Sequence, residues 1–338
     1  MKSGFVNEDN MGLLTDLYQL TMDASYLHHN KNGTSTFEYF IRGLPKNRSY
    51  FIVSGLEQVV HYLQNIKFDE ESIQYLRSQE IFNEEFLSYL KDFKFTGDVH
   101  AMPEGTMAFP NEPIIRITAP RNEAQLIETY LLNIMNFQTM IASKASRVVE
   151  SAKGKGVVDF ALRRTHSPTA GMHAARASYI GGAIGTSNVL AGKEFGMPIF
   201  GTMAHAYIMS FDSELEAFRA YSKTFENSSV FLIDTYDTLQ GVKNAITVAK
   251  ELESEGKKLT GVSLDSGDLC ELSKKVRKAL DDSGLNYVKI LASNDLNEYK
   301  IAEMESNGAC IDMYGVGTEM GSQLPEEGEV VIGEREVE

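Results

Sequence analysis

Seven short apolar runs in the second half of the chain are each followed by polar or glycine residues that could do chemistry. The runs span residues 157–162, 183–189, 199–203, 230–233, 259–264, 288–292 and 309–316. The residues that close or follow them are Arg163 and Arg164; Thr186 and Ser187; Thr202 and His205; Asp234; Asp265, Ser266 and Gly267; Asn294 and Asp295; and Gly315, Gly317 and Thr318. If the runs are parallel strands, their carboxyl ends meet at one edge. The sequence therefore predicts a pocket with a basic side, an acidic side and a glycine-lined edge.

The basic side and the glycine edge of this predicted pocket suit a phosphate group. A guanidinium fork matches phosphate with two parallel hydrogen bonds, so Arg163 and Arg164 at the close of an apolar run favour anion binding over surface ion pairing. The loop G-V-G-T at 315–318 leaves backbone N–H groups free for a phosphate, and a plain turn is the alternative for this loop.

Carboxylates on three separate loops, among them Asp234, Asp265 and Asp295, would repel that phosphate unless they have another partner. They can hold Mg²⁺ that carries the charge of the substrate, or they can accept hydrogen bonds from ribose hydroxyls. A sugar phosphate with a bound metal fits both roles. The alternative for Asp265 and Asp268 is to cap a helix that begins at Leu269.

His205 lies on one of these loops, within the sequence T-M-A-H. A neutral imidazole can act as an acid or a base, or it can capture a phosphoryl group as a nucleophile. A core histidine with satisfied hydrogen bonds is the alternative. Sequence spacing does not choose among these roles.

Stretches of helical periodicity, at 214–225, 238–253, 269–283 and 298–306, alternate with the apolar runs. Such alternation produces a parallel sheet, and about seven units favour a barrel over an open sheet. An open dinucleotide-binding sheet is the competitor, and it is disfavoured because no G-x-G-x-x-G follows the first strand of a unit. Residues 123–320 are therefore predicted to form an α/β domain, an irregular TIM-like (β/α) barrel.

Residues 1–122 have a different pattern. Strand-like segments at 36–42, 50–53 and 114–117 combine with a helical stretch between 56 and 94. This mixture predicts an N-terminal α+β domain. Residues 321–338 are predicted to form a C-terminal tail that packs on this domain.

The composition excludes several classes of protein. The chain has 338 residues with 32 Lys+Arg against 47 Asp+Glu, a net charge of −15, which would repel nucleic acid over most of the surface. No apolar run approaches the roughly 18 residues of a membrane span, so we expect a cytoplasmic protein that binds neither nucleic acid nor membrane. Cys270 and Cys310 lack metal-like spacing and are predicted to be buried free thiols.

Nine motifs taken together resemble the nicotinate phosphoribosyltransferase family. They are L-L-T-D-L-Y-Q-L-T-M (13–22), P-E-G-T (103–106), F-P-N-E-P (109–113), D-F-A-L-R-R (159–164), G-T-S-N-V (185–189), G-T-M-A-H (201–205), L-D-S-G-D-L (264–269), S-N-D-L (293–296) and G-V-G-T (315–318). Each motif alone is modest, and their order along the chain is specific.

The resemblance implies an enzyme that joins nicotinate to 5-phosphoribosyl 1-diphosphate, coupled to ATP hydrolysis through a phosphohistidine, with Mg²⁺ as cofactor. By resemblance His205 is the phosphohistidine, and Tyr18 and Phe160 stack on the two faces of the pyridine ring. The family forms a homodimer in which this tyrosine comes from the second chain. The remaining matches are Thr202 and Thr318 for nicotinate and phosphate, Arg163 for the phosphoribosyl substrate, and Asp265 and Asp295 for ribose hydroxyls and metal.

Ser187 is expected to determine which pyridine the site accepts. By resemblance, enzymes that use nicotinamide have an aspartate in this loop, and a carboxylate there would repel nicotinate. A neutral hydroxyl favours the acid. Many relatives also have an arginine where this chain has Ser263.

Three other activities compete with this prediction: a nicotinamide- or quinolinate-specific relative, a barrel isomerase or aldolase, and a non-catalytic ligand sensor. The aldolase would need a lysine at the carboxyl end of a strand, and Lys289 lies near the start of its run.

Overall fold

The computed structural model describes residues 5–46, 48–226, 228–322 and 332–337. The chain forms two compact units, a first unit of Met1–Ser143 with Pro325–Glu338 and a second unit of Lys144–Leu324. The two units divide within the long helix α6 (Glu128–Ser151), whereas the sequence suggested a boundary after residue 122.

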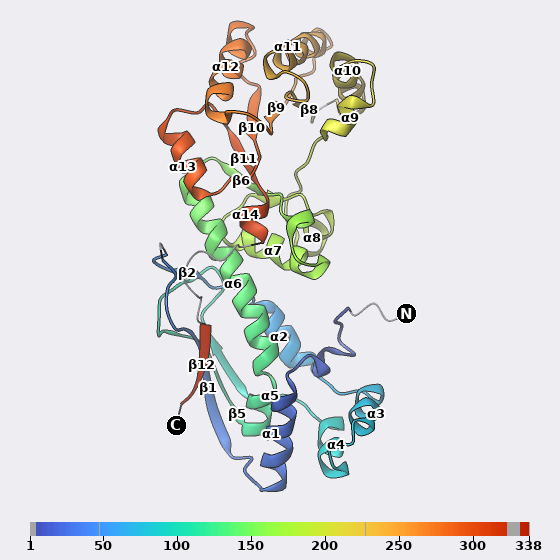
Figure 1. Ribbon diagram of the computed structural model, residues 1–338, viewed down its shortest axis with the longest axis vertical. Helices are drawn as coiled ribbons and strands as arrows, with labels where there is room; N and C mark the ends of the chain where they lie inside the picture. The colour runs from blue at the N-terminus through green and yellow to red at the C-terminus, as the bar shows by residue number, and fades with distance from the viewer. Residues whose placement is uncertain (1–4, 47, 227, 323–331, 338) are drawn as a thin grey trace. The chain divides into compact units, whose positions relative to one another are not determined.

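The first unit contains an antiparallel sheet in the order β12-β1-β5-β3 (Figure 1). The strands are β1 (Thr34–Ile41), β3 (Asp98–Ala101), β5 (Pro113–Pro120) and β12 (Ile332–Val337), with a separate pair β2 (Phe51–Ile52) and β4 (Met107–Ala108). The helical elements are η1 (Met11–Leu13), α1 (Leu17–His28), α2 (Leu56–Asn65), α3 (Glu70–Ser78), α4 (Glu84–Lys91), α5 (Arg121–Leu126) and the start of α6. Strand β12 of the C-terminal tail is hydrogen-bonded to β1.

The motif P-E-G-T has a structural role in this unit. A carboxylate oxygen of Glu104 accepts hydrogen bonds from the N–H groups of Gly55 (2.5 Å) and Leu56 (3.0 Å) at the start of α2. Negative charge at a helix N-terminus satisfies free N–H groups and complements the helix dipole. Glu104 therefore anchors α2.

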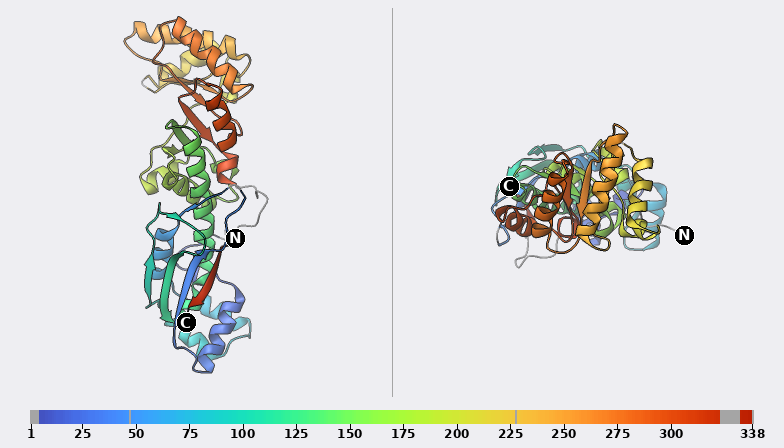
Figure 2. Two further views of the ribbon diagram at one scale, coloured as in Figure 1. Left: turned by 90° about the vertical axis from the view of Figure 1, so that its left-hand side faces the viewer. Right: turned by 90° about the horizontal axis from the view of Figure 1, so that it is seen from above.

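The second unit contains six parallel strands in the order β7-β6-β11-β10-β9-β8. They are β6 (Gly156–Asp159), β7 (Gly185–Thr186), β8 (Val230–Leu232), β9 (Gly261–Leu264), β10 (Lys289–Ala292) and β11 (Met313–Val316). The helical elements are η2 (Leu162–Arg164), α7 (Pro168–Ile180), α8 (Val189–Phe195), α9 (His205–Met209), α10 (Glu214–Thr224), α11 (Thr238–Ser254), α12 (Leu269–Asp282), α13 (Glu298–Ser306) and α14 (Thr318–Gly321). Helices α10, α11 and α12 pack in sequence order, α10 on α11 and α11 on α12 (Figures 1 and 2).

The α/β class and the parallel sheet are confirmed, but a barrel is not. Within the described residues the sheet is open, with β7 and β8 at its two edges. The predicted strand at 199–203 is wrong, because only Ile199 forms an isolated parallel bridge, to Thr186. The hydroxyl of Thr202 donates to the carbonyl of Val230 at 2.5 Å, so this segment reaches β8 through a side chain instead of a backbone ladder.

Polar residues at the strand ends also start the helices that follow. The side chains of Asn188, Asp237, Asp268 and Asn297 accept hydrogen bonds from backbone N–H groups at the starts of α8, α11, α12 and α13. Such N-caps fix where a helix begins, and so fix the length of the loop before it. The capping alternative is thus confirmed for Asp268 and wrong for Asp265, whose carboxylate oxygens lie near Ser293 and His205 instead.

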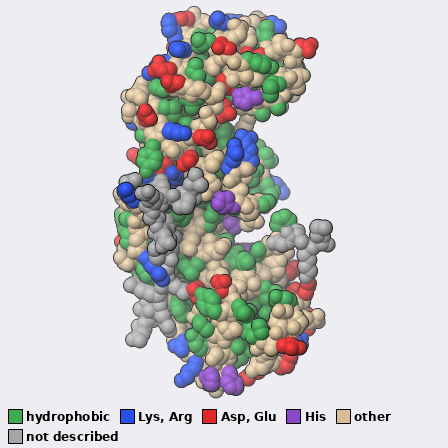
Figure 3. All heavy atoms as spheres, viewed as in Figure 1, with side chains coloured by type: hydrophobic (Ala, Val, Ile, Leu, Met, Phe, Trp, Pro, Cys, Tyr) green, Lys and Arg blue, Asp and Glu red, His purple; other side chains and the backbone are tan. Residues whose placement is uncertain are grey.

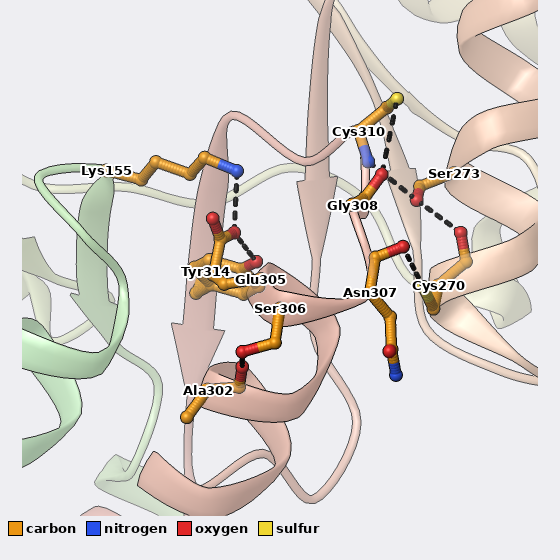
Figure 4. Close-up of polar contacts among 10 residues, drawn as sticks. All are labelled: Lys155, Cys270, Ser273, Ala302, Glu305, Ser306, Asn307, Gly308, Cys310 and Tyr314. Atoms are coloured by element: carbon orange, nitrogen blue, oxygen red, sulfur yellow. Dashed lines mark hydrogen bonds and ion pairs between the residues drawn. The ribbon is translucent and has the colours of Figure 1, made fainter.

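Both cysteines are free but only partly buried, so the prediction of buried thiols is wrong. Figure 4 shows them on either side of Ser273, whose hydroxyl donates to the carbonyl of Cys270 (2.8 Å) and accepts from the N–H of Cys310 (3.1 Å). The same figure shows Glu305 of α13 bonded to Lys155 (2.6 Å) and to the hydroxyl of Tyr314. These contacts attach α12 and α13 to the sheet.

Acidic and basic side chains are interspersed on the face shown in Figure 3. Among the described residues, none of the helices has the length and apolar character needed to cross a membrane.

Candidate functional site

A pocket of about 470 Å³ lies in the second unit where strands β6, β8, β9 and β10 end. Its lining residues are Phe160, Leu162, Arg163, Ser187, Gly201, Thr202, Met203, Ala204, His205, Leu232, Ser263, Asp265, Leu291 and Ser293. Six of the predicted site residues are therefore brought together: Phe160, Arg163, Ser187, Thr202, His205 and Asp265. A cation, a carboxylate, an imidazole and an aromatic ring share one cavity, which suits a ligand with charged and flat parts.

His205 is held between a hydroxyl and a carboxylate. It is the first residue of α9, and its Nδ1 lies 3.2 Å from Thr235 Oγ1 while its Nε2 lies 3.7 Å from Asp265 Oδ2. The histidine side chain is 39% exposed and lines the pocket, which argues against a core histidine. An oriented, accessible imidazole can transfer protons or attack a phosphoryl group.

The loop after β9 is held in place by partly buried polar contacts. The hydroxyl of Ser293 donates to Asp265 Oδ1 at 2.7 Å, and the other oxygen of this carboxylate is the one near His205. Asp234 Oδ2 accepts from the N–H of Asp265 (2.6 Å) and from the hydroxyl of Ser266 (2.7 Å). Asp234 is buried, so in this structure it supports the loop, and its predicted contact with substrate stays a prediction.

The ring of Phe160 lies directly on Gly315. A Cβ atom added at Gly315 would lie 2.4 Å from Phe160 Cε2, which is too close for two carbon atoms. The backbone N–H of Phe160 also donates to the carbonyl of Val316 at 2.8 Å. Gly315 is therefore needed for ring packing beneath the pocket, a role different from the predicted binding of phosphate by its N–H.

Ser187 lines the pocket, whereas its neighbour Thr186 is fully buried. The Thr186 hydroxyl donates to Asp159 Oδ2 at 2.7 Å and accepts from the N–H of Asn188 at 2.9 Å. Burial raises the pKa of the Asp159 carboxyl, and its hydrogen bonds from Thr186 and Ala161 oppose that rise. The predicted substrate contact of Thr186 stays a prediction.

Gly267 and Asn294 line a neighbouring pocket of about 550 Å³ between α12 and α13. Asn294 has φ 104° and Asp295 has φ 43°, a left-handed conformation that residues other than glycine adopt rarely. Strained backbone of this kind gathers at functional sites, and here it lies in the turn between β10 and α13.

Gly317 and Thr318 lie at the start of α14, a four-residue helix that packs against η2. Because η2 carries Arg163, the glycine edge and the basic side of the predicted pocket are neighbours.

Tyr18 belongs to the first unit, whereas all the residues that line this pocket belong to the second. Its side chain is exposed, and its hydroxyl donates to Glu128 Oε1 at 3.0 Å and accepts from Gln19 Nε2 at 2.9 Å. The phenol is anchored at its tip while the ring remains on the surface.

Sequence reasoning assigned no role to Asp159, Leu232 or Leu291. Leu232 is the last residue of β8 and Leu291 lies within β10, and both line the pocket. Asp159 is the first letter of D-F-A-L-R-R, and an aspartate that closes an apolar strand was a usable signal because such a carboxylate needs partners. For a metal, no group of three or more His, Cys, Asp or Glu side chains suited to ligation occurs among the residues with described positions.

Comparison with known proteins identifies relatives over nearly the whole chain. Residues 13–136 match the family model of the nicotinate phosphoribosyltransferase N-terminal domain, and residues 156–332 match that of the nicotinate phosphoribosyltransferase family. The nicotinate phosphoribosyltransferase pncB2 of Mycobacterium tuberculosis is 48% identical over 308 residues, which cover 91% of this chain and 66% of the relative. That of Bacillus subtilis is 45% identical over 325 residues, which cover 95% and 65%. The chain thus spans about two thirds of the length of these curated relatives.

Solved structures agree with the sequence relatives. Human nicotinic acid phosphoribosyltransferase superposes with a TM-score of 0.83 at 28% identity, covering 89% of this chain and 72% of that one. A nicotinate-nucleotide pyrophosphorylase from Pyrococcus furiosus superposes with a TM-score of 0.79 at 26% identity, covering 99% and 78%. With both family models matched in order along the sequence, this chain belongs to the nicotinate phosphoribosyltransferase family.

Proposed function

We propose that this chain catalyses the transfer of a phosphoribosyl group from 5-phosphoribosyl 1-diphosphate to nicotinate, releasing nicotinate mononucleotide and diphosphate for NAD synthesis. The observation that carries the proposal is the shared pocket of Phe160, Arg163, Ser187, His205 and Asp265 in a chain of this family. The activity and the substrates are both part of the proposal, because the chain spans about two thirds of the length of its curated relatives.

Nicotinate binds with its ring on the face of Phe160, where the flat pyridine gains aromatic contact without regard to its substituent. Ser187 lies in the same pocket and offers a neutral hydroxyl to the carboxylate. An aspartate there would repel the acid and accept a hydrogen bond from the amide, so serine favours nicotinate over nicotinamide.

The phosphoribosyl substrate binds through Arg163 at its phosphate and through Asp265 and Asp295 at its ribose hydroxyls. Bound Mg²⁺ would neutralise the diphosphate and make it a better leaving group. The described residues contain no cluster of three ligands, which fits a hard cation held mostly by substrate oxygens and water with one or two carboxylates. We assign that role to Asp265, which lines the pocket, and to Asp295 in the turn after β10.

ATP hydrolysis is coupled through His205. A ring nitrogen of His205 forms a bond to the γ-phosphorus of ATP as the bond to the bridging oxygen breaks, and ADP leaves. Hydrolysis of the phosphohistidine later returns the free imidazole and inorganic phosphate. Support comes from the accessible ring, which Thr235 holds at Nδ1 while Nε2 faces a carboxylate.

Two further features belong to the proposal. The first is an irregular barrel, and its support is that Ile199 bridges Thr186 of β7 while the hydroxyl of Thr202 contacts the carbonyl of Val230 in β8. The active molecule is a homodimer in which Tyr18 of a second copy covers the exposed face of the bound pyridine, supported by the anchored and exposed ring of Tyr18.

Diphosphate release by the purified chain tests this function. Nicotinate, nicotinamide and quinolinate are supplied in turn with 5-phosphoribosyl 1-diphosphate, Mg²⁺ and ATP. We expect release with nicotinate, faster with ATP, and loss of the ATP effect in His205→Ala. A preference for another pyridine would refute the substrate assignment, and intact coupling in His205→Ala would refute the phosphohistidine.

A further inference from the structure

Asp159 lies behind three of the side chains that line the active-site pocket. It is the last residue of β6, it is 1% exposed, and it immediately precedes Phe160 in the chain. Arg163 lies four residues later, on η2, and Ser187 lies on the loop after the neighbouring strand β7. One buried carboxylate, which does not line the pocket, therefore lies next to the segments that carry these three side chains.

The carboxylate of Asp159 connects the two loops that carry these side chains. Its Oδ1 accepts from the N–H of Ala161 at 2.9 Å, which fixes the start of the turn that carries Arg163. Its Oδ2 accepts from the hydroxyl of Thr186 at 2.7 Å, across the junction with β7. A buried carboxylate costs free energy unless it is hydrogen-bonded, so both contacts are strongly favoured.

The hydroxyl of Thr186 also contacts the loop that carries Ser187. It donates to Asp159 and accepts the N–H of Asn188, while the N–H of Ser187 donates to the backbone carbonyl of Asp159 at 2.8 Å. Asn188 in turn caps α8 by accepting the N–H of Ala191 at 3.1 Å. Ser187 is therefore held on both sides, and its position relative to Phe160 follows from the pair Asp159–Thr186.

We propose that Asp159 and Thr186 form a positioning pair that sets pyridine selectivity by fixing Ser187 and Phe160 relative to each other. The inference rests on the proposed nicotinate transfer. Neither residue is a catalytic residue, because the described contacts of both side chains are with protein groups behind the pocket. Discrimination between a carboxylate and an amide of the same shape needs the serine hydroxyl to be held within about 0.5 Å of its productive position, and this pair supplies that restraint.

Thr186→Val tests the pair with little change in volume. Valine keeps the shape of threonine but loses the hydroxyl, which breaks the contacts to Asp159 and Asn188 together. We expect the KM for nicotinate to rise about tenfold, the loss of roughly one well-formed hydrogen bond. The ratio of kcat/KM for nicotinate to that for nicotinamide should fall about fivefold or more, whereas Thr186→Ser, which restores the hydroxyl, should stay within about twofold of wild type.

Thr139→Val is the matched control. Thr139 is fully buried in the first unit, and its hydroxyl also donates one hydrogen bond and accepts another, to the carbonyl of Ser54 (3.1 Å) and from its N–H (3.2 Å). We expect a loss of thermal stability similar to that of Thr186→Val with an unchanged KM and selectivity ratio. Asp159→Asn, which keeps the size of the side chain but replaces one acceptor with a donor, is the second variant if Thr186→Val does not fold.

Three outcomes are informative. A changed selectivity in Thr186→Val or Asp159→Asn with rescue by Thr186→Ser supports the positioning pair. Variants that lose thermal stability like Thr139→Val but keep the wild-type KM and ratio overturn it, and the proposed function stands. A wild-type chain that turns over no pyridine overturns the proposed function, and the inference with it.

Discussion

At the scale of single residues, the position of an aromatic ring in the pocket depends on a glycine. Gly315 lies beneath the ring of Phe160, and a methyl group at this position would lie 2.4 Å from the ring edge. We expect Gly315→Ala to push the ring into the pocket and raise the KM for nicotinate by about tenfold or more, because overpacking forces side chains out of their preferred positions. Steady-state kinetics with nicotinate as the varied substrate measures this.

Gly33→Ala is the control for that substitution. Its added Cβ would meet no atom within 4 Å, so the variant should keep the wild-type KM. Equal KM values for the two variants would contradict the role assigned to Gly315.

At the scale of secondary-structure elements, α1 carries a fully buried aspartate. Asp23 is 0% exposed, and burial raises the pKa of its carboxyl to about 8. Between the unfolded pKa of about 4 and the folded pKa, the unfolded chain loses this proton while the folded chain keeps it, so rising pH lowers stability by about 1.4 kcal/mol per unit. Above the folded pKa the effect is complete and constant.

Asp23→Asn should remove this pH dependence. Its free energy of unfolding in urea, relative to wild type, should increase from about pH 5 to about pH 8 and then level off. The same substitution at the exposed Asp98, Asp98→Asn, is the control. A difference that does not change with pH for Asp23→Asn would show that the buried carboxyl is not protonated in the folded chain.

Helix α13 is attached to the C-terminal part of α6 by a buried ion cluster. Glu298 is 7% exposed, and its two oxygens lie 2.8 Å from Lys144 Nζ and 2.9 Å from Arg147 Nη2. Glu298→Gln removes one side of a buried ion cluster, and we expect a loss of about 3–5 kcal/mol in urea unfolding. The exposed pair Lys274–Glu271 gives the comparison, since Glu271→Gln should cost less than about 1 kcal/mol. Similar losses for both variants would mean that the buried cluster contributes no more than a surface pair.

At the scale of the whole molecule, the periodicity of apolar residues predicted which segments are strands and helices. Side-chain hydrogen bonds determine how those segments are connected to one another. The helices at 214–225, 238–253, 269–283 and 298–306 agree with α10 to α13 within one residue at each end, because their apolar faces repeat regularly. The segment at 199–203 reads as a strand from its apolar residues, but it makes one bridge and a threonine side-chain contact, which no periodicity encodes. Asp159 was missed for a similar reason, since its partner Thr186 lies 27 residues away.

The proposed homodimer concerns the whole molecule, and mixing subunits that carry different substitutions tests it. If Tyr18 and Arg163 of one active site come from different chains, Tyr18→Ala and Arg163→Ala homodimers each have a lesion in every site. Random exchange makes half of the molecules heterodimers, and each heterodimer has one site with both lesions and one intact site, so about one quarter of the wild-type activity should return. If each site is built from one chain, mixing restores nothing, and the assignment of Tyr18 to a partner's pocket is wrong. The two variants are mixed while unfolded and then refolded together, so that chains pair at random, and wild-type chains treated in the same way give the reference for recovery. Gel filtration of the refolded mixture shows whether dimers have re-formed.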